Sequence, residues 1–282
     1  MRPVSTRMAY RNHLGEELAI GGPGWAHYGE TDVLDASAYE YEVSGTRVAS
    51  RSLAASERTL PLVLAGASPE LRDRAYRVLA ADAHAGELGS LVYGEWSVPA
   101  VVTAQALSAW WFDGGVEGRE LTLLMPRPLW CRELLTEYPV LDALAEPVPG
   151  SDYPKPHPYG YGIDAGATRS LDVPTLGPAE WLWRVWGPAA DPYVLQGGNR
   201  HQVEVTVPAG SRLELDTRDR TIFLIDGLGR RTNVVDRRVR GASGSGTYAF
   251  ARLPRGRVEL STTGAFAYDV VVYDERTSPS WT

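Results

Sequence analysis

Apolar and polar residues alternate with a period of two along much of this sequence, which is the pattern of β-strands with one buried face. In the first half of the chain, the sets that share a face are Tyr39, Tyr41 and Val43; Leu60, Leu62 and Leu64; and Leu121, Leu123 and Met125. In the last hundred residues they are Trp181, Trp183 and Val185; Val203, Val205 and Val207; and Phe266, Tyr268, Val270 and Val272. The 29 Gly and 20 Pro residues favour turns between short strands. The pattern predicts a mainly β protein.

One segment has the period of an α-helix instead. Ser68 is a residue type that caps helices, Pro69 suits the first helical position, and Gly86 is a typical helix end. Between them lies a stripe at helical spacing, formed by Leu71, Ala75, Val78, Leu79 and Asp82. We predict one long helix, at about residues 69–85.

The periodicity disappears in a stretch rich in Pro, Gly and Tyr between Pro126 and Pro178. A structureless stretch of this length is unusual inside one compact domain, so we expect a domain boundary within it. We predict two β-sandwich-type domains, an N-terminal β domain with the helix at residues 1–135 and a C-terminal β-sandwich at residues 180–282, joined by a connector at residues 136–179. The turn signals of the last part have the spacing of an antiparallel sandwich.

The composition is that of an ordinary globular protein, with 282 residues of which 44% are hydrophobic and 22% are charged. A chain of this size buries enough surface for a stable core without staples. Cys131 is the only cysteine, which excludes intramolecular disulfides and cysteine-based metal clusters. No apolar run approaches the ~20 residues of a membrane helix, and the N-terminus lacks the apolar stretch of a signal peptide. We expect a soluble protein without membrane insertion.

The net charge of −7 is unevenly distributed. Residues 1–179 contain 14 basic and 23 acidic side chains, whereas residues 180–282 contain 14 basic and 12 acidic side chains. Binding to nucleic acid through its phosphates requires clustered Lys and Arg, so the acidic first part argues against wrapping nucleic acid. An Arg-rich run between Arg230 and Arg240 could contact phosphate, but we favour its interpretation as a solvated edge that discourages strand pairing.

The sequence contains no convincing catalytic or metal-binding motif. The five His residues are scattered, and no pair has the spacing of metal ligands. Asp216, Asp219 and Asp226 could supply the paired carboxylates of a β-sandwich glycosidase, although such aspartates more often form turns. We therefore predict no enzyme activity, no metal and no cofactor, and a glycosidase is a minor alternative.

The aromatic residues are dominated by those with a polar handle, since 9 Trp and 14 Tyr stand against 4 Phe. Such side chains are favoured where a surface is buried against a partner or stacks on a sugar. Trp110 and Trp111 are adjacent, so in a strand they point to opposite faces and one core face cannot bury both. Packing between two layers of the same chain is the alternative explanation. The candidate protein–protein interface residues are Trp25, Trp110, Trp111, Tyr153, Tyr159 and Tyr161.

Several short motifs go further than composition and spacing. In the last part of the chain they are Trp183-Arg184-Val185-Trp186-Gly187-Pro188, Pro192-Tyr193-Val194-Leu195, Val203 to Val207, Gly210 to Thr217, Thr221-Ile222, Gly229, Thr232-Asn233, Leu253-Pro254, Gly256 and Tyr273 to Trp281. In the first part they are Val78 to Asp82, Gly86, Gly89 and Leu91 to Gly94. In combination these motifs resemble the siphophage distal tail proteins, a family of minor tail proteins of the tail tip and baseplate hub, of the type that actinobacteriophages carry.

The resemblance implies a structural virion protein at the distal end of a long non-contractile tail, made and assembled in the host cytoplasm. In that family six copies form a ring, in which N-terminal domains build the centre and galectin-like C-terminal sandwiches project outward. The implied partners are further copies of the chain, the major tail tube protein and the tail-tip hub or tail-associated protein, with the tape measure and receptor-binding proteins as additional candidates. Phage DNA only passes through the lumen. The resemblance implies no catalytic residues.

Two other functions compete with the ring. The main alternative is a carbohydrate-binding β-sandwich module that recognises host cell-wall sugars through exposed Trp or Tyr rings. A tail tube subunit is a further alternative, which a clear second sandwich argues against because tube subunits usually have one domain.

Overall fold

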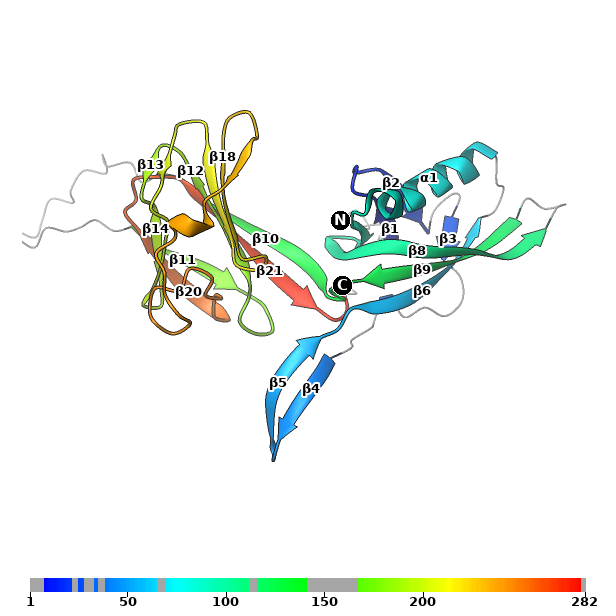
Figure 1. Ribbon diagram of the computed structural model, residues 1–282, viewed down its shortest axis with the longest axis horizontal. Coiled ribbons are helices and arrows are strands. Elements are labelled where there is room, and N and C mark those ends of the chain that lie inside the picture. The colour runs from blue at the N-terminus through cyan, green and yellow to red at the C-terminus, as the bar shows by residue number, and fades with distance from the viewer. Residues whose placement is uncertain are drawn as a thin grey trace, which may run out of the picture. The chain divides into compact units, whose positions relative to one another are not determined.

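The computed structural model describes residues 8–21, 25–27, 33–34, 39–64, 69–111, 116–140 and 167–279. The chain forms two compact units (Figure 1). The first unit comprises Met1–Arg132 and Glu275–Thr282, and the second comprises Glu133–Asp274. Both consist mainly of antiparallel strands, which confirms the prediction of a mainly β protein.

The bounds of these units differ from the predicted domain bounds at two places. Strand β11 (Ala167–Val173) lies in the range 136–179, for which the sequence predicts a connector, and it pairs along its whole length with β20 (Gly256–Thr262) of the second unit. Glu275–Thr282 belongs to the first unit, although it lies in the range predicted as a C-terminal sandwich. Backbone pairing with β20 places β11 in the second unit, and an ion pair of 2.6 Å links Glu275 to Arg127 of the first unit. Local composition does not report contacts between residues so far apart in the sequence.

Seven strands of the first unit pair in a closed circuit. β1 pairs with β2 and β7, β7 with β8, β8 with β9, β9 with β6, β6 with β3, and β3 in parallel with β2. Their bounds are β1 Met8–Arg11, β2 Glu17–Ile20, β3 Trp25–His27, β6 Ser56–Leu64, β7 Gly89–Tyr93, β8 Trp96–Trp111 and β9 Val116–Met125. Helix α1 (Pro69–Ala85) contacts β2 and β8. Its bounds agree with the predicted 69–85, and it is the one α-helix of the described residues.

The core of the first unit lies between α1 and the strands. Alternate residues of two strands are buried as their spacing predicts, namely Leu60, Leu62 and Leu64 of β6 and Leu121, Leu123 and Met125 of β9. The helix contributes the stripe Ala75, Val78 and Leu79 to the same cluster. Burying one such leucine stabilises the fold by roughly 1.5–3 kcal/mol, so this alternation determines which face of β6 and β9 points inward.

A buried carboxylate fixes the β1–β2 turn on the helix. Asp82 of α1 accepts hydrogen bonds from the Tyr10 hydroxyl at 2.5 Å and from the backbone N–H of His13 at 2.7 Å, and its Oδ1 lies 2.6 Å from His13 Nδ1. Burial and the neighbouring Asp82 carboxylate raise the pKa of Tyr10. A side chain at Gly89 would meet Asp82 Oδ2 at 2.3 Å, so glycine is needed at this close approach.

The first unit also carries a hairpin that pairs with no other described strand. β4 (Tyr39–Ser44) and β5 (Arg47–Leu53) pair only with each other, and Figure 1 shows the hairpin extending away from the other strands of its unit. The sequence predicts that Tyr39, Tyr41 and Val43 share a sheet face, and the register shift between Glu42 and Val43 places its extra residue, Ala49, on β5. β4 confirms the strand prediction, and its residues Tyr41 and Val43 are both exposed.

The second unit contains two antiparallel sheets around one core. One sheet has the order β19-β18-β17-β12-β21-β10, the other has the order β11-β20-β14-β15, and β13 pairs with β16. The bounds not yet given are β10 Trp130–Tyr138, β12 Trp181–Trp186, β13 Ala189–Ala190, β14 Tyr193–Gln196, β15 Asn199–Gln202, β16 Thr206–Val207, β17 Arg212–Asp216, β18 Thr221–Ile225, β19 Arg231–Asn233, η1 Val235–Arg237 and β21 Tyr268–Arg276. The chain passes between the units within β10 and within β21.

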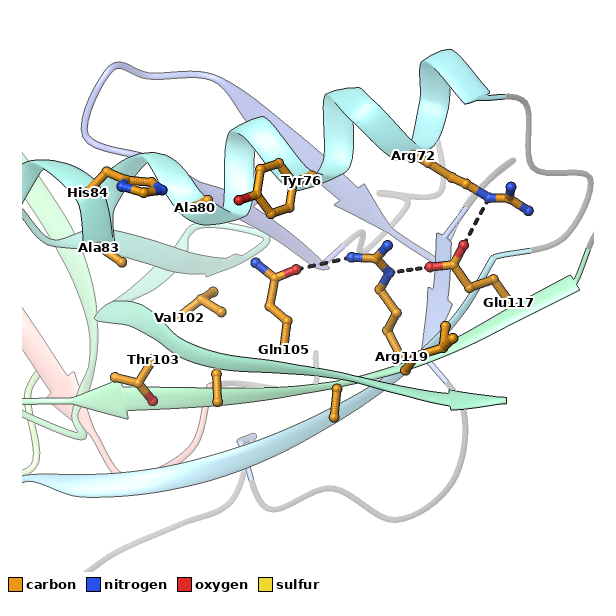
Figure 2. A pocket seen from close by; sticks show the side chains of 13 residues that line it. Arg72, Tyr76, Ala80, Ala83, His84, Val102, Thr103, Gln105, Glu117 and Arg119 are labelled. Carbon is orange, nitrogen blue, oxygen red and sulfur yellow. Dashed lines mark hydrogen bonds and ion pairs between the residues drawn. The ribbon is translucent and has the colours of Figure 1, made fainter. Parts of the chain in front are cut away.

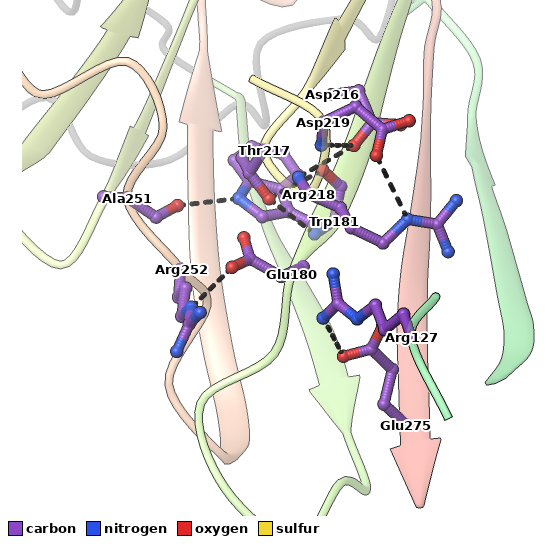
Figure 3. Close-up of polar contacts among 10 residues, drawn as sticks. All are labelled: Arg127, Glu180, Trp181, Asp216, Thr217, Arg218, Asp219, Ala251, Arg252 and Glu275. Atoms are coloured by element: carbon purple, nitrogen blue, oxygen red, sulfur yellow. Dashed lines mark hydrogen bonds and ion pairs between the residues drawn. The ribbon is translucent and has the colours of Figure 1, made fainter. Parts of the chain in front are cut away.

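Large aromatic side chains fill the core of the second unit. Trp181 and Trp183 of β12 are fully buried, as the alternation at these positions predicts. The Trp181 indole donates a hydrogen bond to the Ala251 carbonyl at 2.9 Å (Figure 3). Its ring meets the buried His201 ring edge-on. The Trp181 indole therefore has a partner inside the sandwich, whereas the buried Trp183 Nε1 has no hydrogen-bond partner among the described residues.

Candidate functional site

A cavity of about 710 Å3 lies between α1 and strands β8 and β9 of the first unit (Figure 2). The helix contributes Arg72, Tyr76, Ala80, Ala83 and His84, and the strands contribute Val102 to Leu107, Glu117 and Arg119. The β8 part of the lining includes two small residues, Ala104 and Ala106, and Gln105 between them points towards Arg119.

One charged group dominates the cavity. Glu117 is buried, its Oε2 lies 2.9 Å from Arg72 Nε, and its Oε1 pairs with Arg119, which also donates to Gln105 Oε1 at 3.2 Å. Figure 2 shows these residues in a row from the helix to the strands. Glu117 is the one carboxylate in the lining, and it lies between two guanidinium groups. Glycoside hydrolysis needs a second carboxylate across a cleft, and this lining does not supply one. The ion pair between Glu117 and Arg72 instead links α1 to the sheet.

Two of the aspartates considered for glycosidase chemistry, Asp216 and Asp226, accept hydrogen bonds from the backbone of turns. Asp216 Oδ1 accepts the backbone N–H groups of Arg218 at 2.8 Å and Asp219 at 3.3 Å (Figure 3). Its Oδ2 accepts the Tyr273 hydroxyl at 2.9 Å. These contacts close the β17–β18 turn, and burial raises the pKa of Tyr273. This is the turn interpretation that the sequence favours.

Asp226 forms a second turn of the same kind. It accepts the backbone N–H groups of Leu228 and Arg230 at 2.9 Å, and its Oδ2 lies 2.7 Å from Arg230 Nε. The backbone hydrogen bond from Arg230 holds the pKa of Asp226 below its usual value. A general acid in glycoside hydrolysis needs a raised pKa, and the shift here has the opposite direction.

The buried histidine of the second unit serves as a structural group. His201 is buried, its Nδ1 lies 2.8 Å from the Ala249 carbonyl, and Asn199 lies 3.0 Å from its Nε2. Burial lowers the pKa of His201 to about 4, so the ring is neutral at pH 7. Among residues whose placement the structure describes, no three His, Cys, Asp or Glu side chains gather as metal ligands.

The second unit has a pocket of its own, of about 470 Å3. Three arginines and two aromatic rings characterise its lining: Arg220, Arg238, Arg240, Tyr248 and Phe250. The sequence interpretation of the Arg run as a solvated edge did not anticipate this pocket. The signal available in the sequence is the strong excess of Arg over acidic residues in this stretch, but Arg220 and Tyr248 join the site only through folding.

The structure places the candidate interface residues only in part. Trp25 lies in β3 opposite Leu64, and Trp110 and Trp111 lie at the end of β8 opposite Glu117 and Val116. Tyr153, Tyr159 and Tyr161 lie outside the described residues. The interface role of all six remains a prediction. The distribution of Trp and Tyr did not single out the hairpin β4–β5, which is also exposed. The apolar residues of this hairpin lie on two strands that pair only with each other.

Both units together have the fold of phage tail-hub proteins. SPP1 Dit, described as a paradigm of the hub adsorption apparatus in phages that infect Gram-positive hosts, matches with a TM-score of 0.58 and 14% sequence identity over 96% of this chain and 98% of its own. A chain of the phage P2 baseplate in its activated conformation with calcium matches with a TM-score of 0.60 and 12% identity over 97% of this chain and 99% of its own. The strontium form of that baseplate gives the same values. At such identity the likeness establishes the fold.

No protein-family model matches the sequence, and no curated protein matches it. The helix of the described part is too short and too polar to cross a membrane.

Proposed function

We propose that this chain is a structural protein of a phage virion, located at the distal tip of a long non-contractile tail, where it joins the tail tube to the hub and host-recognition proteins. The observation that carries the proposal is the fold shared with SPP1 Dit over 96% of the chain, which includes both units and their order. A non-enzymatic role agrees with the chemistry of the described carboxylates, since Glu117 lies between guanidinium groups and the turn aspartates are fully engaged.

The form of assembly that we propose is a ring of six copies. The hairpin β4–β5 supports self-association, because Tyr41, Val43 and Val48 are 55%, 67% and 61% exposed. A two-stranded hairpin by itself is marginally stable in water. A neighbouring copy that covers the hairpin would bury this apolar surface, and head-to-tail contacts of this kind close into a ring when the rotation between copies allows it.

The charge distribution suits the proposed passage of DNA through the ring. Residues 1–179 contain nine more acidic than basic side chains, and an acidic lumen repels the phosphates of passing DNA. The partners that we propose are the tail tube protein on one side and the tail-tip hub or tail-associated protein on the other. A strongly basic lumen in an assembled ring would contradict this part of the proposal.

The test is the mass and symmetry of the purified full chain, by light scattering and negative-stain imaging. A six-fold ring with an open channel is the expected result. A matched pair of variants then tests the hairpin: Val43→Ser combined with Val48→Ser should shift the mass towards the monomer, whereas Leu228→Ser, at an exposed leucine of the second unit, should leave the mass unchanged. A wild-type chain that stays monomeric at all concentrations would contradict self-assembly.

A further inference from the structure

The Arg-lined pocket of the second unit is concave and positively charged. Arg220 comes from the turn between β17 and β18, and Arg238 and Arg240 follow η1. Tyr248 and Phe250 complete the wall, with ring centroids 6.1 Å apart and ring planes at 80°. The lining contains no carboxylate.

The positive charge of this region is only partly compensated, since Asp226 pairs with Arg230 and Glu180 pairs with Arg252. Residues 227–258 contain eight Arg and one acidic residue, Asp236, which lies 3.8 Å from Arg237. Arg238 donates to the Val235 carbonyl at 2.5 Å, which fixes its guanidinium without neutralising it. Arg220 and Arg240 have no carboxylate of the described residues within ion-pair distance. A concave site with three guanidinium groups favours a ligand with anionic oxygens, which guanidinium binds in a bidentate geometry.

The wall of the pocket is held in place before any ligand arrives. Asn199 accepts the Tyr248 backbone N–H and donates to the Tyr248 carbonyl, both at 3.0 Å. The preceding loop is tied to β15 by the Arg200 N–H, which donates to the Gly246 carbonyl at 2.8 Å. A side chain at Gly241 would meet Thr247 Oγ1 at 2.3 Å, so the loop is closely folded on itself. Such a preorganised site loses little entropy on binding.

We propose that this pocket binds an anionic sugar, that is, a sugar ring bearing a phosphate or carboxylate group. The anionic oxygens pair with Arg220 and Arg240, while the apolar face of the sugar ring lies against Tyr248. Guanidinium groups alone would suit any anion, and the two aromatic rings at the same pocket add the surface on which a sugar ring packs. The site is a property of the second unit and does not depend on ring assembly.

The experiment is calorimetric titration of the full chain with glucose 1-phosphate and with glucuronic acid, with inorganic phosphate and glucose as comparison ligands. We expect saturable binding of at least one anionic sugar, at least tenfold tighter than inorganic phosphate or glucose. The affinity should fall as sodium chloride is raised, because added salt screens partly exposed charges. Arg240→Gln should weaken binding about tenfold, as expected for the loss of a charge-assisted hydrogen bond. Arg257→Gln, at an exposed arginine outside the lining, should change the affinity less than twofold.

Several outcomes would overturn the proposal. Equal affinity for inorganic phosphate would make the pocket a plain anion site, and equal affinity for glucose would remove the role of the arginines. Tighter binding of adenosine monophosphate or of a poly-aspartate peptide would assign the pocket to a nucleotide or to an acidic protein segment. An equal loss in Arg240→Gln and Arg257→Gln would indicate diffuse charge, and no binding of either anionic sugar at millimolar concentration would also contradict it. The salt titration uses the wild-type chain, so it stands even where a variant folds poorly, and none of these results bears on ring formation.

Discussion

Hairpin β4–β5 and the strand pair β6–β9 have similar alternating sequences but opposite environments. In β6–β9, every second residue from Leu60 to Leu64 and from Leu121 to Met125 is buried under α1 and the rest of the circuit. In the hairpin, Val43 and Val48 are cross-strand partners and both are exposed. An alternating pattern therefore predicts a strand with an apolar face, but it does not tell whether the same chain or another molecule covers that face.

The largest effect should come from the packed strands. Leu62→Ala should lower the free energy of unfolding by about 3.5 kcal/mol, because Leu62 is fully buried and its truncation leaves a cavity. Denaturant unfolding followed by circular dichroism measures this change. Val48→Ala in the hairpin is the matched control, with an expected change below about 0.5 kcal/mol at a concentration where the chain is monomeric. Equal losses at the two sites would mean that the hairpin is packed in the monomer as well.

A pH titration extends the comparison to the second unit. The folded state keeps His201 neutral down to about pH 4, whereas the unfolded chain binds this proton from about pH 6.5. The unfolded state therefore binds more protons between these values, and stability falls as the pH falls, by about 2.5 kcal/mol between pH 7 and pH 4.5. His201→Gln should flatten this part of the stability profile, and His84→Gln on α1 should leave it unchanged. A wild-type profile without this slope would mean that His201 opens to water.

A smaller loss of stability is expected when the buried carboxylate of Asp82 in the first unit is replaced. Asp82→Asn should cost about 2 kcal/mol, because an amide retains only one of the two acceptors that Tyr10 and His13 use. Asp73→Asn, on the exposed side of the same helix, is the control and should change stability by less than about 0.5 kcal/mol. Thermal unfolding of the three proteins compares them directly, and similar midpoints for Asp82→Asn and wild type would refute an anchoring role.

The smallest effect on folding should come from the hairpin itself, where the effect on assembly is largest. Val43→Ser should change the free energy of unfolding of the monomer by less than about 0.5 kcal/mol, since no described core residue loses a contact. The same variant should reduce the oligomeric fraction in sedimentation experiments. A strongly destabilised monomer, or an unaltered oligomer, would show that the hairpin serves the fold of its own chain.

Local features of the structure were predictable because their causes are local. Pro69 and Gly86 frame a stripe of apolar residues, and the helix occupies Pro69–Ala85, while the predicted cap Ser68 lies outside the described residues. The alternation at Trp181 and Trp183 predicted their burial, since neighbouring strand residues face opposite sides of a sheet. The turns at Asp216 and Asp226 were also predictable, because these carboxylates accept hydrogen bonds from backbone groups two to four residues away.

The two pockets were not predictable in the same way. Arg72 and Glu117 are separated by a helix and two strands in the sequence, and only the packing of α1 on β8 and β9 brings them together. Arg220, Arg240 and Tyr248 likewise meet because the β17–β18 turn and the segment after η1 line the same pocket. The shift of register between Glu42 and Val43 has no local signature either, since the pairing strand decides where a bulge forms.

The amino-acid sequence by itself determined that the chain is mainly β, that it has one helix over residues 69–85, and that residues such as Leu62 and Trp183 lie in a core, because period and capping act over a few residues. The tertiary structure decided the closed circuit of seven strands, the exposed hairpin, the place of β11 and the Arg-lined pocket. Each of these depends on contacts between segments far apart in the chain, and such contacts are selected by the packing of the whole unit rather than by the residues on either side.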